Sequence, residues 1–163
     1  MQPDRIEIFE MVRLADVPEP ERTTIADLEC PTYAQTPFTA APAANQREVA
    51  IVSSAGLIVR GERPLLPSEA GYRAIASTVD DGDILCSHVS TNFDRTGFQQ
   101  DLNVMLPRAR LQELAGDGTI GGATDTHYSF MGATAPEALE DKARELGGAL
   151  LALGVNTVVL APV

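Results

Sequence analysis

The sequence is short of several residue types, and each shortage excludes a class of protein. Lys142 is the only lysine among 163 residues, which argues against an enzyme that forms a lysine Schiff base. No apolar run follows Met1, so a secretory signal is not expected, and no run is long enough to cross a bilayer. Two cysteines in such a chain indicate thiols in a reducing compartment. We therefore expect a soluble, cytoplasmic protein.

Basic residues are also scarce, with 12 Lys and Arg against 23 Asp and Glu, a formal net charge of −11. This acidic excess argues against nucleic acid and anionic membranes, which select clusters of Lys and Arg. The expected partner is a small-molecule substrate, together with a partner subunit or further copies of the chain. The length suits one domain with a sizeable core.

The composition divides the chain into two parts. Residues 1–47 are predicted to form an N-terminal arm and linker, because five prolines interrupt regular structure there: Pro18, Pro20, Pro31, Pro37 and Pro42. Cys30, Tyr33 and Phe38 favour an arm that docks on the rest of the chain over a disordered tail. Residues 48–163 are expected to form an α/β domain.

Apolar runs and helical patterns alternate in the second part. Residues 49–53, 83–88 and 155–160 are typical of buried strands. Pro107 and Pro136 can each open a helix. The second of these helices carries leucines at helical spacing: Leu139, Leu146, Leu150 and Leu153. Because strand, helix and strand recur, we predict a three-layer α/β fold with a largely parallel sheet.

The scarce ring residues lie close together. Both histidines and four of the eight aromatic residues fall in residues 87–103 and 126–132. In α/β folds, ligands bind beyond the carboxyl ends of the strands. The loops that follow the first two strands, 53–56 and 88–103, should therefore be neighbours and form a site. The alternative is that rings cluster because they form a core.

The segment 87–103 supplies most of the candidate site residues. His88 could transfer protons near neutral pH, with Asp94 beside it, and Arg95 could clamp a substrate carboxylate. The predicted substrate-binding residues also include Ser54, Asn92 and Asn103. The alternative is that Asp94, Asp101 and Asn103 cap turns and brace a long loop.

Three further residues are candidates for catalysis. His127 or Tyr128 could supply a proton donor, or they could belong to a packed strand end in which His127 is satisfied internally. Cys86 could act as a thiolate nucleophile, although a thiol in an apolar strand is more often a small buried hydrophobe. A redox pair of Cys86 and Cys30 stays open, but their spacing matches no redox motif.

A metal site is a further alternative. Cys86, His88 and His127 would have to converge, with Asp94 nearby, to supply the three or four ligands that zinc needs. Cys86 and His88 would point to the same face of a strand, but this is not a recognised ligand spacing. The sequence indicates no cofactor and no metal.

These segments, in this order, resemble one family. The matching stretches are 51–57, Ser87-His88, 93–97, 101–104, Arg110-Leu111, Ile120-Gly121 and 127–132, within a similarity that runs from about Thr36 to the C-terminus. The family is the selenoprotein B component of the glycine, sarcosine, betaine and D-proline reductases. The resemblance implies a reductase subunit that cleaves a carbon–heteroatom bond with a selenolate or thiolate. It also implies a partner subunit that presents the substrate, sometimes through a pyruvoyl group.

The resemblance includes one departure. In the family, the Cys or Sec redox motif directly follows a strand that resembles 158–163, and this sequence ends at Val163. Three explanations stay open: a selenocysteine codon read as a stop or an engineered end, a paralogue repurposed to redox-neutral chemistry, or a thiol role taken over by Cys86 or Cys30. The expected function is an enzyme acting on an amino- or carboxylate-bearing small molecule; the alternatives are a non-catalytic accessory subunit or a metal-binding protein.

Overall fold

The computed structural model describes residues 13–28, 32, 34, 39–91 and 93–163. The chain forms two compact units, Met1–Thr36 and Pro37–Val163. The described part of the first unit holds a 3-10 turn, Leu14–Asp16, and the short helix α1, Glu21–Ala26. Cys30, Tyr33 and Phe38, for which we predicted docking, lie outside the described residues.

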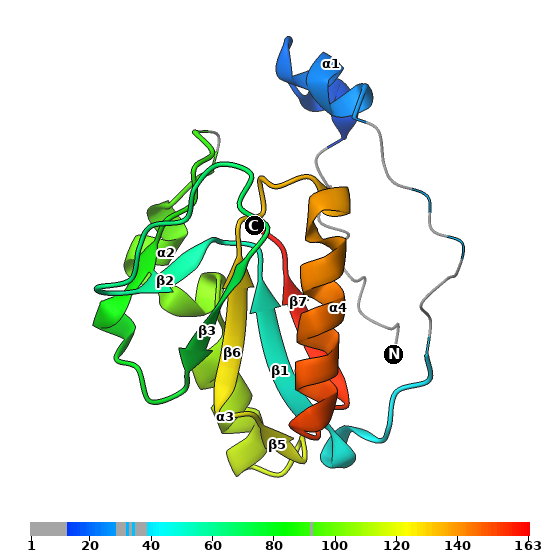
Figure 1. Cartoon of the computed structure of the whole chain (residues 1–163), viewed down its shortest axis with the longest axis vertical. Coiled ribbons are helices and arrows are strands. Elements are labelled where there is room, and N and C mark those ends of the chain that lie inside the picture. The colour runs from blue at the N-terminus through cyan, green and yellow to red at the C-terminus, as the bar shows by residue number, and fades with distance from the viewer. Residues whose placement is uncertain (1–12, 29–31, 33, 35–38, 92) are drawn as a thin grey trace, which may run out of the picture. The chain divides into compact units, whose positions relative to one another are not determined.

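The second unit is built on a mostly parallel sheet, as predicted (Figure 1). Its described strands are β1 (Glu48–Ser53), β3 (Tyr72–Ala76), β5 (Gly122–Ala123), β6 (Thr126–Phe130) and β7 (Thr157–Ala161). One edge of β1 pairs in parallel with β7 over five residues, and β5 and β6 pair in parallel with the other edge. β3 runs antiparallel to β6. β1 is central because its apolar side chains are buried on both faces.

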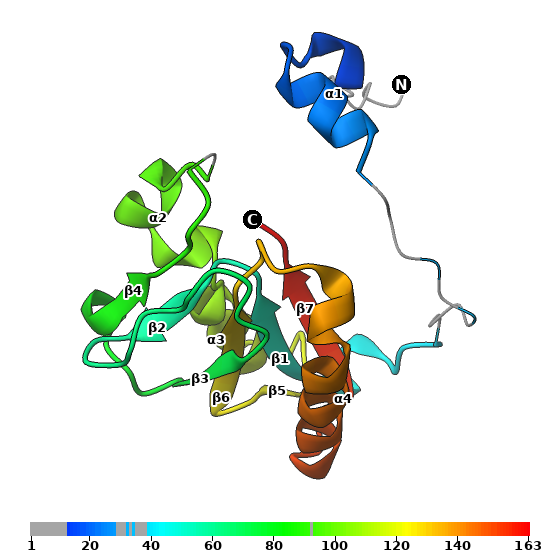
Figure 2. The same cartoon turned by 45° about the horizontal axis from the view of Figure 1, so that its top comes forward.

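Helices cover the two faces of this sheet and give the predicted three layers (Figures 1 and 2). On one face, α4 (Pro136–Ala152) packs Leu146 and Leu150 against Val52 and Tyr128. The opposite face carries α2 (Thr96–Gln100), a 3-10 turn (Leu102–Val104) and α3 (Arg108–Gly116), and its core includes Val49, Ile51, Ile75 and Leu106. Among the described residues, no helix has the length and apolar character needed to span a membrane.

Two details differ from the sequence-based expectation. The predicted strand 83–88 is shorter, β4 (Ile84–Cys86), and pairs antiparallel with β2 (Leu57–Val59) in a separate two-stranded sheet. The reason is Gly56, whose φ of +63° turns the chain sharply after β1, so that β2 leaves the main sheet and β4 follows it. Leu153, placed by its spacing on the buried face of α4, is 57% exposed because the helix ends before it.

Candidate functional site

The ends of three parallel strands meet at one edge of the main sheet (Figure 1). The backbone N–H of Ser54 donates to the carbonyl of Ala161 at the end of β7 (3.1 Å), and the N–H of Gly132 donates to the carbonyl of Ser54 (3.0 Å). The Ser54 hydroxyl accepts from the N–H of Val163 (3.0 Å). A Cβ at Gly132 would lie 2.6 Å from the Ser54 carbonyl oxygen, so this close approach requires glycine. This edge is the candidate site.

His88 lies beside this edge, as the predicted proximity of the two loops requires. The N–H of Ser87 donates to the Gly56 carbonyl (2.9 Å), and a Cβ at Gly56 would lie 3.2 Å from Cα of His88. The His88 side chain is 8% exposed, and its ring stacks on Phe93 with centroids 4.6 Å apart. Nδ1 accepts from the N–H of Ser90 (3.2 Å), while the buried Nε2 has no hydrogen-bond partner among the residues that the structure describes. Burial first, and then the Arg95 charge, lowers the pKa of His88.

Arg95 braces the loop that carries His88. Its Nη2 donates to the carbonyls of His88 (2.6 Å) and Ser90 (3.2 Å), and its Nη1 donates to the carbonyl of Phe93 (3.4 Å). The guanidinium carbon also lies 5.5 Å from the centroid of the Phe93 ring. Among the described residues, no hydrogen bond uses the Arg95 Nε–H or the second Nη1 hydrogen. These are the donors for the carboxylate contact predicted from the sequence.

Other polar residues of this segment hydrogen-bond to their own loop. Asp94 accepts from the N–H of Thr96 at the start of α2 (2.8 Å), and these hydrogen bonds with Thr96 lower the pKa of Asp94. Asn103 donates to the Asp101 carboxylate (2.8 Å) and accepts from the N–H of Ala109 (3.1 Å). Asn92 lies outside the described residues.

Cys86 is the last residue of β4 and precedes His88 by two positions. Its partly buried thiol lies 3.6 Å from the Ala55 carbonyl oxygen, to which it donates. Cys30 is not among the described residues, so a pair with Cys86 stays a prediction. Among the residues that the structure describes, no three His, Cys, Asp or Glu side chains are grouped so that they could hold a metal ion.

His127 and Tyr128 lie within β6 and point to opposite faces of the sheet. His127 is level with Ile75 of β3 and is 1% exposed. Its Nδ1 accepts from the N–H of Ile51 (3.3 Å), and its Nε2 has no partner among the described residues. Burial, followed by the Arg108 charge, lowers the pKa of His127 to about 4. Tyr128 packs under α4, with its ring edge-on to Tyr72 at 5.7 Å. The structure therefore places both residues inside the sheet, away from the loop of His88.

The comparison with family models identifies this architecture. The model for glycine/sarcosine/betaine reductase selenoprotein B matches residues 22–163, which include the whole candidate site. The chain belongs to this selenoprotein B family. The match begins at residue 22, inside the predicted arm and N-terminal to Thr36, where the sequence resemblance begins. Comparisons with curated proteins and with solved structures gave no significant match.

The sequence did not predict two parts of the candidate site of this selenoprotein B family member, Ser129 and the loop 61–71. Ser129 of β6 is fully buried; its hydroxyl donates to the Ser53 carbonyl (3.0 Å) and accepts from the N–H of Leu57 (2.9 Å), which fixes the turn at Gly56. The loop 61–71 joins the edge through Glu69, whose carbonyl accepts from the Thr134 hydroxyl (3.0 Å). The available signal for Ser129 was a small hydroxyl residue between Tyr128 and Phe130 in a strand.

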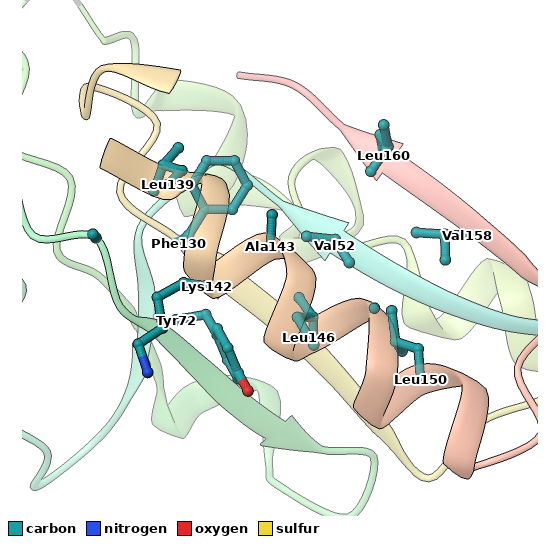
Figure 3. A pocket seen from close by; sticks show the side chains of 12 residues that line it. Val52, Tyr72, Phe130, Leu139, Lys142, Ala143, Leu146, Leu150, Val158 and Leu160 are labelled. Carbon is teal, nitrogen blue, oxygen red and sulfur yellow. The ribbon is translucent and has the colours of Figure 1, made fainter. Parts of the chain in front are cut away.

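A concavity lies between α4 and the sheet, and its lining includes no residue of the His88 loop (Figure 3). Its volume is about 370 Å³, and its walls are almost wholly apolar, with Phe130, Leu146 and Leu160 among them. The polar groups near it are already paired, because Lys142 Nζ lies 2.5 Å from the Glu145 carboxylate and the Tyr72 hydroxyl donates to Glu145 (3.1 Å). Among the described residues at this concavity, Lys142 and Tyr72 are therefore both held by Glu145.

Proposed function

We propose that this chain is a B-type component of a reductase and binds a small amino- or carboxylate-bearing molecule at the edge formed by Ser54, Gly56, Gly132 and His88. The observation that carries the proposal is the His88 ring, which is buried, held by Phe93 and the Ser90 N–H, and without a partner at Nε2 among the described residues. Buried polar atoms are nearly always paired, so an orphan nitrogen in a loop whose backbone adjoins Gly56, next to the carboxyl ends of the parallel strands, supports a ligand contact.

The family supplies the reaction class. Reductive cleavage of a carbon–heteroatom bond converts R–X, two electrons and two protons into R–H and H–X. In the family, a pair of thiols, or a thiol and a selenol, provides the two electrons and ends as a disulfide or selenenylsulfide. That redox motif follows a strand similar to 158–163, and the Ala161 carbonyl at the end of β7 accepts a hydrogen bond from the N–H of Ser54. The same edge is therefore where family chemistry and the His88 loop would meet. We further propose a cytoplasmic location.

The test is turnover in the reconstituted reductase complex, assayed with glycine, sarcosine, betaine and D-proline. His88→Asn keeps an acceptor near the Nδ1 position and removes the Nε2 group; His127→Asn makes the same change inside the sheet. We expect His88→Asn to lower turnover about a hundredfold, within the usual range for loss of a positioned polar group, and His127→Asn to leave it within about threefold.

Circular dichroism and thermal melting of both variants establish that the fold is intact. If both folded variants turn over substrate like the wild type, the enzymatic proposal is wrong. The second candidate, an accessory subunit without chemistry of its own, then takes its place. One observation favours that candidate. Large apolar side chains are exposed on β7 and at the C-terminal end of α4, and such surfaces often mark protein contacts. These residues are Leu151, Leu153, Val158 and Leu160.

A further inference from the structure

The hydrogen bond at Nδ1 fixes the tautomer of His88. A backbone N–H can only donate, so the Ser90 N–H, 3.2 Å from Nδ1, requires a lone pair on that nitrogen. A neutral imidazole carries one proton, which must then be on Nε2. Protonation of Nδ1 would set two N–H groups against each other. His88 is therefore built as a neutral ring with an N–H at Nε2.

The surroundings of the ring favour this neutral form. The side chain is 8% exposed and stacks on the apolar ring of Phe93. The charged group beside it is Arg95, which donates to the His88 carbonyl and opposes a second positive charge. A neutral imidazole gives up its Nε2 proton only with great difficulty, so it is a hydrogen-bond donor and a poor acid.

We propose that His88 binds the ligand as a neutral Nε2–H donor to an oxygen acceptor, a carboxylate or carbonyl oxygen, and does not transfer a proton. The inference rests on the proposed function for the location of the ligand, but not for the tautomer. Nε2–H is buried and has no partner within the described part of the chain, so an oxygen that reaches it satisfies an otherwise unpaired donor. Ser90, Phe93 and Arg95 are positioning residues that hold the ring in this state.

The tautomer is tested by ¹⁵N NMR of the imidazole rings in the full chain at pH 7. The chain has only two histidines, and the His127→Asn variant assigns both sets of signals. His127 is a matched internal reference because its Nδ1 also accepts a backbone N–H, from Ile51. We expect both rings to be neutral with the proton on Nε2. An imidazolium, or a proton on Nδ1 of His88, would overturn the inference.

The ligand class is tested by titration with glycine, sarcosine and betaine against methylamine and trimethylamine, which lack the carboxylate. We expect the carboxylates alone to move the His88 Nε2–H signal, with His127 unchanged. His88→Gln keeps a donor near the Nε2 position and should bind within a few-fold of wild type, as measured by calorimetry. His88→Asn keeps only the Nδ1-side acceptor and should bind about tenfold or more weakly.

These outcomes separate the two proposals. If no carboxylate binds to the wild type, the proposed function fails together with the ligand role of His88, whatever the tautomer is. If carboxylates bind but His88→Asn binds them as tightly as wild type, the site stands and the donor role of His88 is wrong. Equal shifts with the amines would likewise contradict recognition through an oxygen acceptor.

Discussion

His88 and His127 make the same kind of hydrogen bond in different places. Each accepts a backbone N–H at Nδ1, and neither Nε2 has a partner in the part of the chain that the structure describes. His127 is enclosed by β1, β3 and β6, whereas His88 stands in a loop beside the end of β1. The unpaired nitrogen therefore has consequences for stability at His127 and for binding at His88.

The lowered pKa of His127 predicts a pH-dependent stability. Its pKa is about 4 in the folded chain against 6.5 ordinarily, so the unfolded chain binds more protons between these values. Stability should therefore be full above pH 6.5 and fall as the pH drops towards 4, by about 3 kcal/mol at most for this group. Urea unfolding at pH 7 and pH 4.5 measures the loss.

His127→Asn is the control for this prediction, since asparagine can still accept the Ile51 N–H but does not titrate. The variant should lose less stability than the wild type over the same pH interval, whatever its stability at pH 7. Parallel losses in the two proteins would show that burial of His127 does not set the acid sensitivity.

The sequence predicted both histidines as site residues, but it did not show which of them lies in a strand and which in a loop. The segments 87–103 and 126–132 each hold one histidine beside aromatic residues. Burial of His127 depends on β3 pairing antiparallel with β6, a contact between residues about fifty positions apart. The partners of Arg95 are backbone carbonyls, which leave no trace in a residue pattern.

Among the elements, the turns after β1 and β6 depend on the absence of a side chain. Gly132→Ala would place Cβ 2.6 Å from the Ser54 carbonyl oxygen and 2.8 Å from the Ser54 Cβ. Because backbone must shift to make room, we expect a loss of about 1–3 kcal/mol in the free energy of unfolding. Gly148→Ala, inside α4 with open space around the new Cβ, should instead gain about 0.5–1 kcal/mol. Chemical denaturation of both variants checks the contrast, and a neutral Gly132→Ala would contradict it.

Helix α3 is tied to the turn after β3 through one buried guanidinium. Arg108 donates to the carbonyls of Ala76, Ser77 and Val79 and pairs with Asp81. Lysine cannot reproduce this fork of donors, so Arg108→Lys should cost about 2–3 kcal/mol of unfolding free energy.

Arg110→Lys is the matched control on the same helix. Arg110 is exposed and forms a surface ion pair with Glu113 one turn along, so its replacement should change stability by less than about 0.5 kcal/mol. Similar losses for the two variants, measured by urea unfolding, would show that the Arg108 contacts contribute nothing special.

Elements with a strong local pattern were predictable, and elements set by long-range pairing were not. The helix α4 begins at Pro136 as expected, because proline fits the first turn and the leucine spacing is regular. β4 was placed in the wrong sheet because three apolar residues carry no information about their partner. That partner is chosen by the turn at Gly56 and by Ser129, which holds the Leu57 N–H.

For the whole molecule, the net charge argues against one class of partner, and the exposed apolar surface favours another. The net charge of −11 disfavours polyanions, while Val158 and Leu160 leave apolar surface on β7 at the mouth of the α4 concavity. If this surface meets a subunit of the reductase complex, Leu160→Arg should weaken that association at least about tenfold by analytical ultracentrifugation. Leu114→Arg, an exposed leucine on α3, is the control and should associate normally. Equal affinity of Leu160→Arg and wild type would exclude this face as the contact.

The family and the α/β architecture followed from the ordered segments and the strand–helix alternation, both of which span most of the chain. The sequence predicted only the loops that form the site and not its contacts, because these join residues far apart in the chain: Ser54, Gly132 and Val163. Hydrogen bonds between backbone groups close this edge, and such bonds are available to almost any sequence.

The most direct test of the proposed site is a titration of the full chain with glycine, sarcosine, betaine and D-proline, followed at the ring signals of its two histidines. A ligand at the carboxyl edge of β1, β6 and β7 should shift the His88 signals in a saturable way and leave His127, inside the sheet, unchanged. His88→Asn should abolish or strongly weaken the saturable binding. If no compound of this series moves His88, or if His127 responds while His88 does not, the substrate site is not where the structure has led us to propose it.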